Sequence, residues 1–197
     1  LINDNLKNKF PEIKIRVPKI IVIATHEFDY FMESNNLWDI ALGNLSNEKI
    51  EKKFIRGKLS KKLILNLKEI IKKVTFPLAV RSSSLLEDSQ YQPLAGMYST
   101  YMLPNSHINE KERFNQLCET IKRIYASTFF QGPKSLMDNI IHRHEEEKMG
   151  VIIMELAGQK HNEIFYPTFS GVAQSYNYYP VSYMKRKEGV VFTALGL

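Results

Sequence analysis

The fold is decided by one stretch of the chain, Phe76-Pro77-Leu78-Ala79-Val80-Arg81-Ser82-Ser83-Ser84. Its apolar first half predicts a strand, and this strand runs directly into a hydroxyl-rich turn that carries one cation. An Arg at a strand end offers a permanently charged, two-pronged clamp for phosphate, with neutral donors beside it. Alternatively, Arg81 satisfies loop carbonyl groups or pairs with Glu87 or Asp88. These residues by themselves leave both interpretations open.

The segments around this stretch predict helices and strands in mixed order. Apolar periodicity predicts a first helix after Thr25 with a weak point at Asn35-Asn36, a third over 59–74, a fourth over 110–130, and a fifth from Pro133 to His144. The second helix, after Ser46, is predicted from Ser46 as a cap and Glu48 in the first turn. Strands are predicted at 19–24, 98–103, 151–156, 171–175 and 190–195. Because helices and strands do not alternate strictly, the order favours an α+β or α/β protein over a pure class.

Length and composition exclude several classes of protein. The chain has 197 residues, which suits one domain or two small lobes. Its one Cys makes neither an internal disulfide nor a thiolate metal site, so we expect a reducing, cytoplasmic location. No run approaches the roughly 18 apolar residues that span a bilayer. The first residue is Leu and the last lies in an apolar run, so we expect a piece of a longer protein.

The positive charge is spread along the chain. Lys and Arg number 27 against 21 Asp and Glu, a formal net charge of +6. The basic pairs Lys52-Lys53, Lys61-Lys62 and Lys72-Lys73 flank helical apolar stripes, which favours solvated helix faces. Residues 185–187 are predicted to form a charged turn between two strands. The pattern argues against a nucleic-acid partner and is compatible with a small anionic ligand.

Most familiar catalytic patterns are absent from the sequence. His142 and His144 stand two apart on a predicted helix and therefore point to different faces, which argues against a metal pair. There is no Gly-x-Ser-x-Gly elbow, Walker loop or Gly-x-Gly-x-x-Gly fingerprint. Cys118 lies within the apolar stripe of 110–130, where a small core residue is expected rather than a nucleophile.

The stretch quoted above resembles the N-terminal nucleotide-binding domain of phosphoenolpyruvate synthase and pyruvate, phosphate dikinase. The family's Val-Arg-Ser-Ser turn, Glu-Asp pair and Ala-Gly-x-x-x-Thr segment correspond to residues 80–83, 87–88 and 95–100. Further matches follow in the family's order, at 17–31, 149–156, 169–173 and 194–197. The resemblance covers most of the chain. It implies an α+β, ATP-grasp fold of two lobes, which we place at 1–103 and 104–197, with a nucleotide between them.

The resemblance also assigns site residues. Arg81 corresponds to the family Arg that contacts ATP phosphates, and it is the one catalytic candidate. Thr100 corresponds to a threonine near the nucleotide. Met154, Glu155 and Leu156 correspond to the hinge strand that holds adenine through backbone groups and apolar side chains. Family members often carry Gln where Met154 stands, and packing of Met154 in the core is the alternative.

The chain departs from the family pattern in two respects. After Ala173 it reads Gln174-Ser175-Tyr176-Asn177-Tyr178-Tyr179-Pro180 in place of an Asp/Asn-x-Pro-x-Thr-Gly turn, and Leu85-Leu86 replace small residues. The family's Gly-Gly-Lys loop and its acidic, Mg²⁺-binding pair are expected outside 1–197. We therefore expect the metal ligands to lie outside this chain. We also expect the chain alone to bind ATP weakly or not at all and to lack turnover.

The resemblance implies a reaction for the parent protein. ATP phosphorylates a histidine on a mobile domain, and pyruvate accepts the phosphoryl group, so that ATP, pyruvate and water yield phosphoenolpyruvate, AMP and phosphate. The implied partners are ATP, Mg²⁺, pyruvate and the phosphohistidine domain, with neither nucleic acid nor membrane. A glucan or antibiotic acceptor is the alternative within the same fold. A nucleotide-sensing module without catalysis is the alternative outside enzymes, and the altered turn at 174–180 motivates it.

Overall fold

The structure is a computed structural model that describes residues 9–13, 15–84, 98–137 and 147–196. Its contacts divide the chain into two compact units, Leu1–Leu156 and Ala157–Leu197. In the described ranges, no helix is long and apolar enough to cross a membrane.

The first unit is built on a four-stranded antiparallel sheet of order β1-β4-β2-β3. The strands are β1 (Ile20–Ile23), β2 (Leu78–Ser83), β3 (Thr100–Leu103) and β4 (Gly150–Glu155). β4 comes last in the sequence but lies between β1 and β2, so it closes the sheet at its centre.

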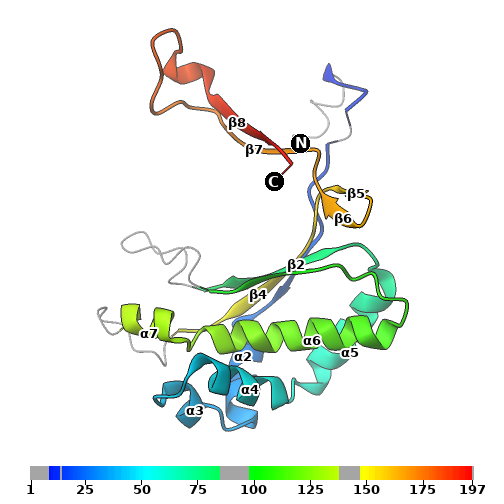
Figure 1. The fold of residues 1–197 in the computed structure, drawn as a ribbon, viewed down its shortest axis with the longest axis vertical. Helices are drawn as coiled ribbons and strands as arrows, with labels where there is room; N and C mark the ends of the chain where they lie inside the picture. The colour runs from blue at the N-terminus through cyan, green and yellow to red at the C-terminus, as the bar shows by residue number, and fades with distance from the viewer. Residues whose placement is uncertain (1–8, 14, 85–97, 138–146, 197) are drawn as a thin grey trace. The chain divides into compact units, whose positions relative to one another are not determined.

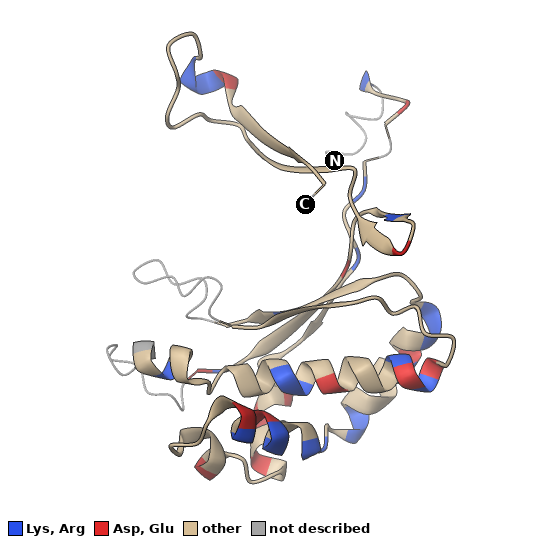
Figure 2. Cartoon of the chain, in the orientation of Figure 1, with Lys and Arg blue, Asp and Glu red and all other residues tan. Residues whose placement is uncertain are grey.

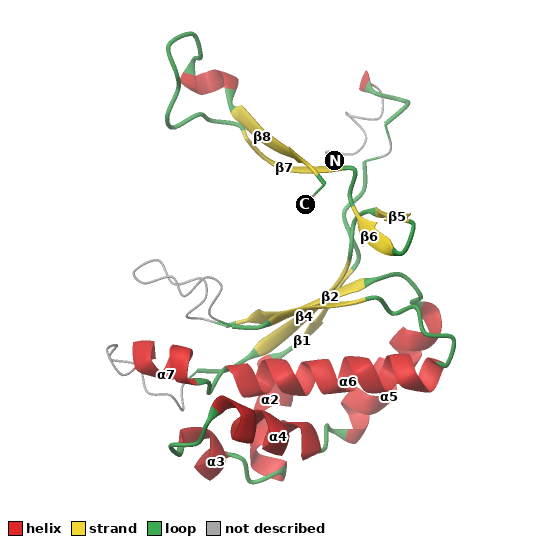
Figure 3. Ribbon diagram, in the orientation of Figure 1, coloured by secondary structure: helices red, strands yellow, loops and turns green. Residues whose placement is uncertain are grey.

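The helices of this unit lie on one face of the sheet (Figures 1 and 3). They are α2 (Thr25–Ser34), α3 (Trp38–Leu42), α4 (Asn47–Arg56), α5 (Lys61–Lys73), α6 (Glu110–Ser127) and α7 (Gln131–Met137). Side-chain caps begin two of them. The Ser60 hydroxyl accepts the Leu63 amide proton at 3.0 Å, and the Asn109 carbonyl oxygen accepts that of Lys111 at 2.9 Å.

An aromatic cluster joins the helices beneath the sheet. Phe28 of α2 packs edge-on against Tyr125 of α6 at 5.2 Å between ring centroids, and it stacks on Phe129 at 6.2 Å. Phe31 and Phe54 complete the cluster, and all five rings are fully buried. Each ring removes a large apolar area from water, so this cluster holds the helical layer together.

The second unit consists of two antiparallel hairpins. β5 (Gln159–His161) pairs with β6 (Ile164–Tyr166), and β7 (Phe169–Gln174) pairs with β8 (Val190–Leu195). The 3-10 turn Arg186–Glu188 lies between β7 and β8, and Glu188 accepts the Lys185 amide proton at 2.9 Å. The charged turn predicted at 185–187 is therefore present.

The mixed α+β class is confirmed, as are the strands and helices predicted within the described residues. Three local expectations differ. The helix predicted after Thr25 is two helices, because Asn36 adopts a left-handed φ of 51° that ends α2. Thr25 opens α2 but makes no cap. Residues 81–83 belong to β2 rather than to a turn. The loop expected after Ser84 and the part of the predicted fifth helix at 138–144 lie outside the described residues.

The predicted lobe boundary between 103 and 104 stays a prediction. The compact units divide later, between Leu156 and Ala157. The reason is β4, which pairs with β1 and β2 and thereby keeps residues up to Glu155 in the first unit.

The basic pairs lie where a solvated helix face was expected. Lys52-Lys53, Lys61-Lys62 and Lys72-Lys73 are all exposed on α4 and α5, and Figure 2 shows Lys and Arg interspersed with Asp and Glu along the helices. The charge of these helices is therefore mixed rather than gathered into one basic stripe.

Burial predicts an unreactive thiol at Cys118. It raises the pKa of that thiol from 9.0 to about 11, and Lys122 and Lys68 offset only part of the shift. At pH 8 we therefore expect iodoacetamide to alkylate the folded protein about a hundredfold more slowly than the urea-unfolded protein. The rate should rise about tenfold per pH unit and level off near pH 11 rather than pH 9.

The same shift predicts how stability depends on pH. Between pH 9 and 11 the unfolded chain loses the thiol proton while the folded chain keeps it, so the free energy of unfolding falls as pH rises. A plateau of the alkylation rate near pH 9 in the folded protein would contradict the assignment of Cys118 to the core.

Candidate functional site

The face of the four-stranded sheet opposite the helices carries three of the predicted site residues, Arg81, Thr100 and Met154. Side chains alternate between the two faces of a strand. Along β2, Leu78, Val80 and Ser82 are buried toward the helices, whereas Arg81 is exposed on the other face. Residues paired across strands share a face. The register therefore shows which other residues lie beside Arg81.

Two cross-strand rows occupy this face. The first runs from Val22 of β1 through Ile152 of β4 and Arg81 of β2 to Thr100 of β3. The second runs in the same order through Ile20, Met154, Ala79 and Met102. The rows are two residues apart along each strand, or roughly 7 Å. One row thus ends in a cation and a hydroxyl, and its neighbour is wholly apolar.

Arg81 and Thr100 are direct partners in the register. Both side chains are exposed, and among the residues that the structure describes the Arg81 guanidinium makes no hydrogen bond or ion pair. Glu87 and Asp88, its alternative partners, lie outside the described residues. The guanidinium therefore presents its donors beside a hydroxyl at one end of an apolar surface.

The apolar row is only partly open to solvent. Ala79 lies between the two methionines Met102 and Met154 and is 1% exposed. Met102 is 62% exposed, and Val22 of the neighbouring row is 65% exposed, which is far more than sheet residues in a core retain. Met154 lies on this face, between Ile20 and Ala79, and is half-buried.

The Glu155 side chain lies on the opposite face from these rows. It is only 8% exposed. Its carboxylate accepts a hydrogen bond from Arg16 at 2.8 Å and one from the Lys19 amide at 3.3 Å. The strand alternation therefore separates Glu155 from Met154, although the two are adjacent in sequence. The carboxylate ties residues 16–19 to the end of β4.

The backbone donors at the end of β4 are also engaged. The Glu155 amide donates to the Lys19 carbonyl at 2.9 Å, and the Leu156 amide donates to the Pro77 carbonyl at 3.0 Å. An adenine ring can contact this segment through the Met154 side chain and the free lone pairs of carbonyl oxygens. Contact with either N–H group requires exchange of one of these bonds.

The sequence predicts Arg81 and Thr100 of the first row and Met154 of the second as site residues, but not their neighbours on this face. The alternation in Thr100-Tyr101-Met102-Leu103 is the available signal for Met102. Arg16 carries no local signal, because its partner Glu155 lies 139 residues away in the chain.

No metal centre is found in this part of the protein. Among the described residues, no group of three or more His, Cys, Asp or Glu side chains could hold an ion. The site as described consists of a cation, a hydroxyl and an apolar surface. These groups suit a ligand that joins a flat apolar ring to an anion.

Comparison with known proteins identifies similar chains. Residues 3–197 match the family described as "Pyruvate phosphate dikinase, AMP/ATP-binding domain". The chain is also 29% identical over 147 residues to the "Uncharacterized phosphotransferase YvkC" of Bacillus subtilis (strain 168). That match covers 71% of this chain and 16% of the relative, so the chain spans less than a fifth of the relative's length.

The hydrogen bonds from Arg16 and Lys19 to the Glu155 carboxylate give a testable prediction. We expect Glu155→Gln to speed hydrogen exchange at the Lys19 amide, because the substitution weakens the bonds that hold residues 16–19 to β4. Arg16 is 56% exposed, so the free energy of unfolding should fall by less than about 1 kcal/mol. Glu163→Gln, at an exposed side chain in the second unit, is the matched control. Unchanged exchange at Lys19 would show that the carboxylate does not fix this segment.

Proposed function

This chain belongs to the pyruvate phosphate dikinase AMP/ATP-binding domain family, and from that premise we propose that ATP lies across the two rows of the sheet. One observation supports the proposal most directly. A cation and a hydroxyl, Arg81 and Thr100, are register partners in the row next to an apolar row. A nucleotide has the same order of parts, with a flat base at one end and phosphates at the other.

Each predicted residue then has a distinct role. Arg81 holds phosphate through a bidentate, charge-assisted pair, and by offsetting charge it supports phosphoryl transfer. Thr100 adds a neutral hydrogen bond beside it. Met154 supplies polarizable apolar contact to the adenine face. Leu156 contributes backbone at the rim. Glu155 acts by holding residues 16–19 rather than by touching the nucleotide.

Mg²⁺ belongs to this proposal as the ion that would neutralise the ATP phosphates. The described residues offer it no cluster of ligands, so we assign it none and derive no step through it. We likewise propose, on the family resemblance, that the two lobes form an ATP-grasp module divided near residue 103, and that the protein works in the cytoplasm.

The role of Arg81 can be tested by ATP binding. In the full-length protein we expect Arg81→Met to weaken ATP binding by roughly 10- to 100-fold, the range for losing a charge-assisted pair, with Arg81→Lys in between. Isothermal titration calorimetry with ATP and with adenosine measures this, and adenosine affinity should stay unchanged. Arg56→Met, on the exposed C-terminal turn of α4, is the control. Equal ATP affinity in the Arg81 and Arg56 variants would refute the phosphate clamp.

For the full-length protein we propose a phosphoenolpyruvate synthase-like reaction. ATP, pyruvate and water would be converted to phosphoenolpyruvate, AMP and phosphate, and the phosphoryl group would reach pyruvate through a histidine of another domain. A glucan or antibiotic acceptor is the nearest alternative. A nucleotide sensor without turnover is favoured by one observation, the Tyr-rich segment at 174–180 that replaces the family's turn.

The acceptor can be identified from AMP formation. With the full-length protein we expect AMP and phosphoenolpyruvate in equal amounts when ATP and pyruvate are both present, and little AMP without pyruvate. The Arg81→Met variant, shown to be folded by circular dichroism, serves as the inactive control. If a glucan or an aminoglycoside stimulates AMP release in the absence of pyruvate, that compound rather than pyruvate is the acceptor. ATP binding without any AMP would favour the sensor.

A further inference from the structure

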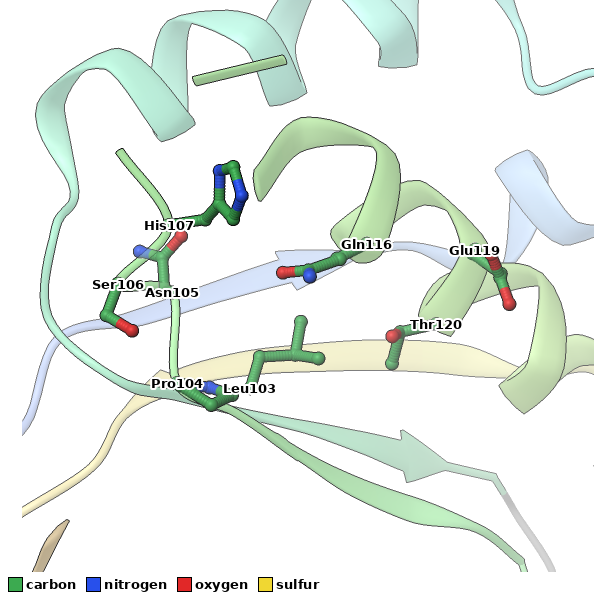
Figure 4. Close-up of a pocket in the computed structure, with 8 residues that line it drawn as sticks. All are labelled: Leu103, Pro104, Asn105, Ser106, His107, Gln116, Glu119 and Thr120. Carbon is green, nitrogen blue, oxygen red and sulfur yellow. The ribbon is translucent and has the colours of Figure 1, made fainter. Parts of the chain in front are cut away.

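A second pocket, of about 380 Å³, lies on the helical side of the sheet. Leu103 and the turn at 104–107 form one wall, and Gln116, Glu119 and Thr120 of α6 form the other (Figure 4). Leu103 pairs with the buried Leu78, so it faces the helices, whereas Thr100 at the other end of β3 faces the proposed nucleotide site. The pocket is therefore separate from the two rows.

The turn that forms one wall is held rigidly. Asn105 adopts a left-handed φ of 51° and donates its amide protons to the carbonyl groups of Val74 at 3.0 Å and Phe76 at 3.1 Å. Arg113 of α6 donates to the His107 carbonyl at 3.0 Å. The wall is thus fixed to α6 and to the segment before β2, and a ligand would meet a preformed surface.

Two deeply buried side chains direct spare oxygen atoms to this pocket. Thr120 is 5% exposed and Asn105 is 4% exposed, and both line it. Within the described part of the chain, neither the Thr120 hydroxyl nor the Asn105 carbonyl oxygen has a hydrogen-bond partner. Both oxygens can therefore accept hydrogen bonds, either from water or from a ligand that donates them.

The charge of the pocket favours a cation. Glu119 accepts hydrogen bonds from Arg123 at 2.8 and 3.1 Å, and the same guanidinium also pairs with Glu51. Among the residues that line the pocket, Glu119 is the one acidic side chain, and both of its hydrogen bonds from Arg123 end on Oε1. No Lys or Arg is among the residues that line it. Phosphate is disfavoured here, in contrast to the face that carries Arg81.

The other polar side chains that line the pocket can form hydrogen bonds with hydroxyl groups of a ligand. The Nδ1 atom of His107 accepts the Asn109 amide proton at 3.0 Å, which leaves the ring proton on Nε2 as a donor. Ser106 and Gln116 each offer both a donor and an acceptor, and Leu103 and Pro104 form an apolar floor. A hydroxyl-bearing molecule with one apolar face can satisfy all of them.

We propose that this pocket binds a small organic amine that also carries hydroxyl groups, of the size of an amino sugar. The ammonium group lies toward Glu119, and donors of the ligand meet the Asn105 and Thr120 oxygens. The site is distinct from the nucleotide face and does not depend on the function proposed for that face.

Glucosamine and glucose form a matched pair of probes, because they differ only in an ammonium and a hydroxyl group. By calorimetry on the full-length protein below pH 7, we expect glucosamine to bind at least tenfold more tightly than glucose. Thr120→Val keeps the side-chain volume and removes the hydroxyl, so it should weaken glucosamine binding about fivefold, the size of one hydrogen bond, and leave ATP binding unchanged.

Thr100→Val is the matched control, since it makes the same change on the nucleotide face. It should leave glucosamine binding unchanged, whether or not it affects ATP. Thermal unfolding of both variants checks that they are folded. Absence of glucosamine binding at 10 mM, equal binding of glucose, or an equal effect of the two Thr variants on glucosamine would each overturn the proposal.

Discussion

The register of β2 between β3 and β4 is the constraint on which the rest of the structure depends. It pairs Arg81 with Thr100 and with Ile152, and it pairs Ala79 with Met102 and with Met154. A slip of one residue on β2 would turn Arg81 into the aromatic core and bring Val80 out to the open face. The large cost of burying an unpaired guanidinium enforces the observed register. The residues that make the candidate ligand face thereby also specify the fold.

Much of this arrangement could be predicted from local patterns. β-branched runs located β1, β4 and β8, and helical periodicity located α5 and α6, because each of these elements buries a continuous face. Prediction was weaker for very short elements. The break after α2 lies at the weak point predicted at Asn35-Asn36, but β5 and β6 have three residues each, too few for a period to appear.

The candidate site was predictable only residue by residue. Motif resemblance singled out Arg81, Thr100 and Met154, and the structure brings all three onto one face. The motif could not show that Met154 and Glu155 have different surroundings. Adjacent strand residues point to opposite faces, and a motif does not state which face the helices cover. The Arg16 partner of Glu155 and the spare oxygens of Asn105 and Thr120 arise from contacts across the fold, which no local pattern encodes.

The two faces of the sheet divide the protein's polar chemistry by charge. On the open face Arg81 lies beside apolar residues. A bound anion there would neutralise the guanidinium and pair with it next to a surface that excludes water. On the helical face, the one acidic side chain that lines the polar cavity is Glu119, which favours a cationic ligand there. The net charge of +6 describes neither place, because the exposed Lys pairs of α4 and α5 contribute to it and are already solvated. Local charge imbalance next to accessible space, rather than total charge, therefore determines which ligand each face favours.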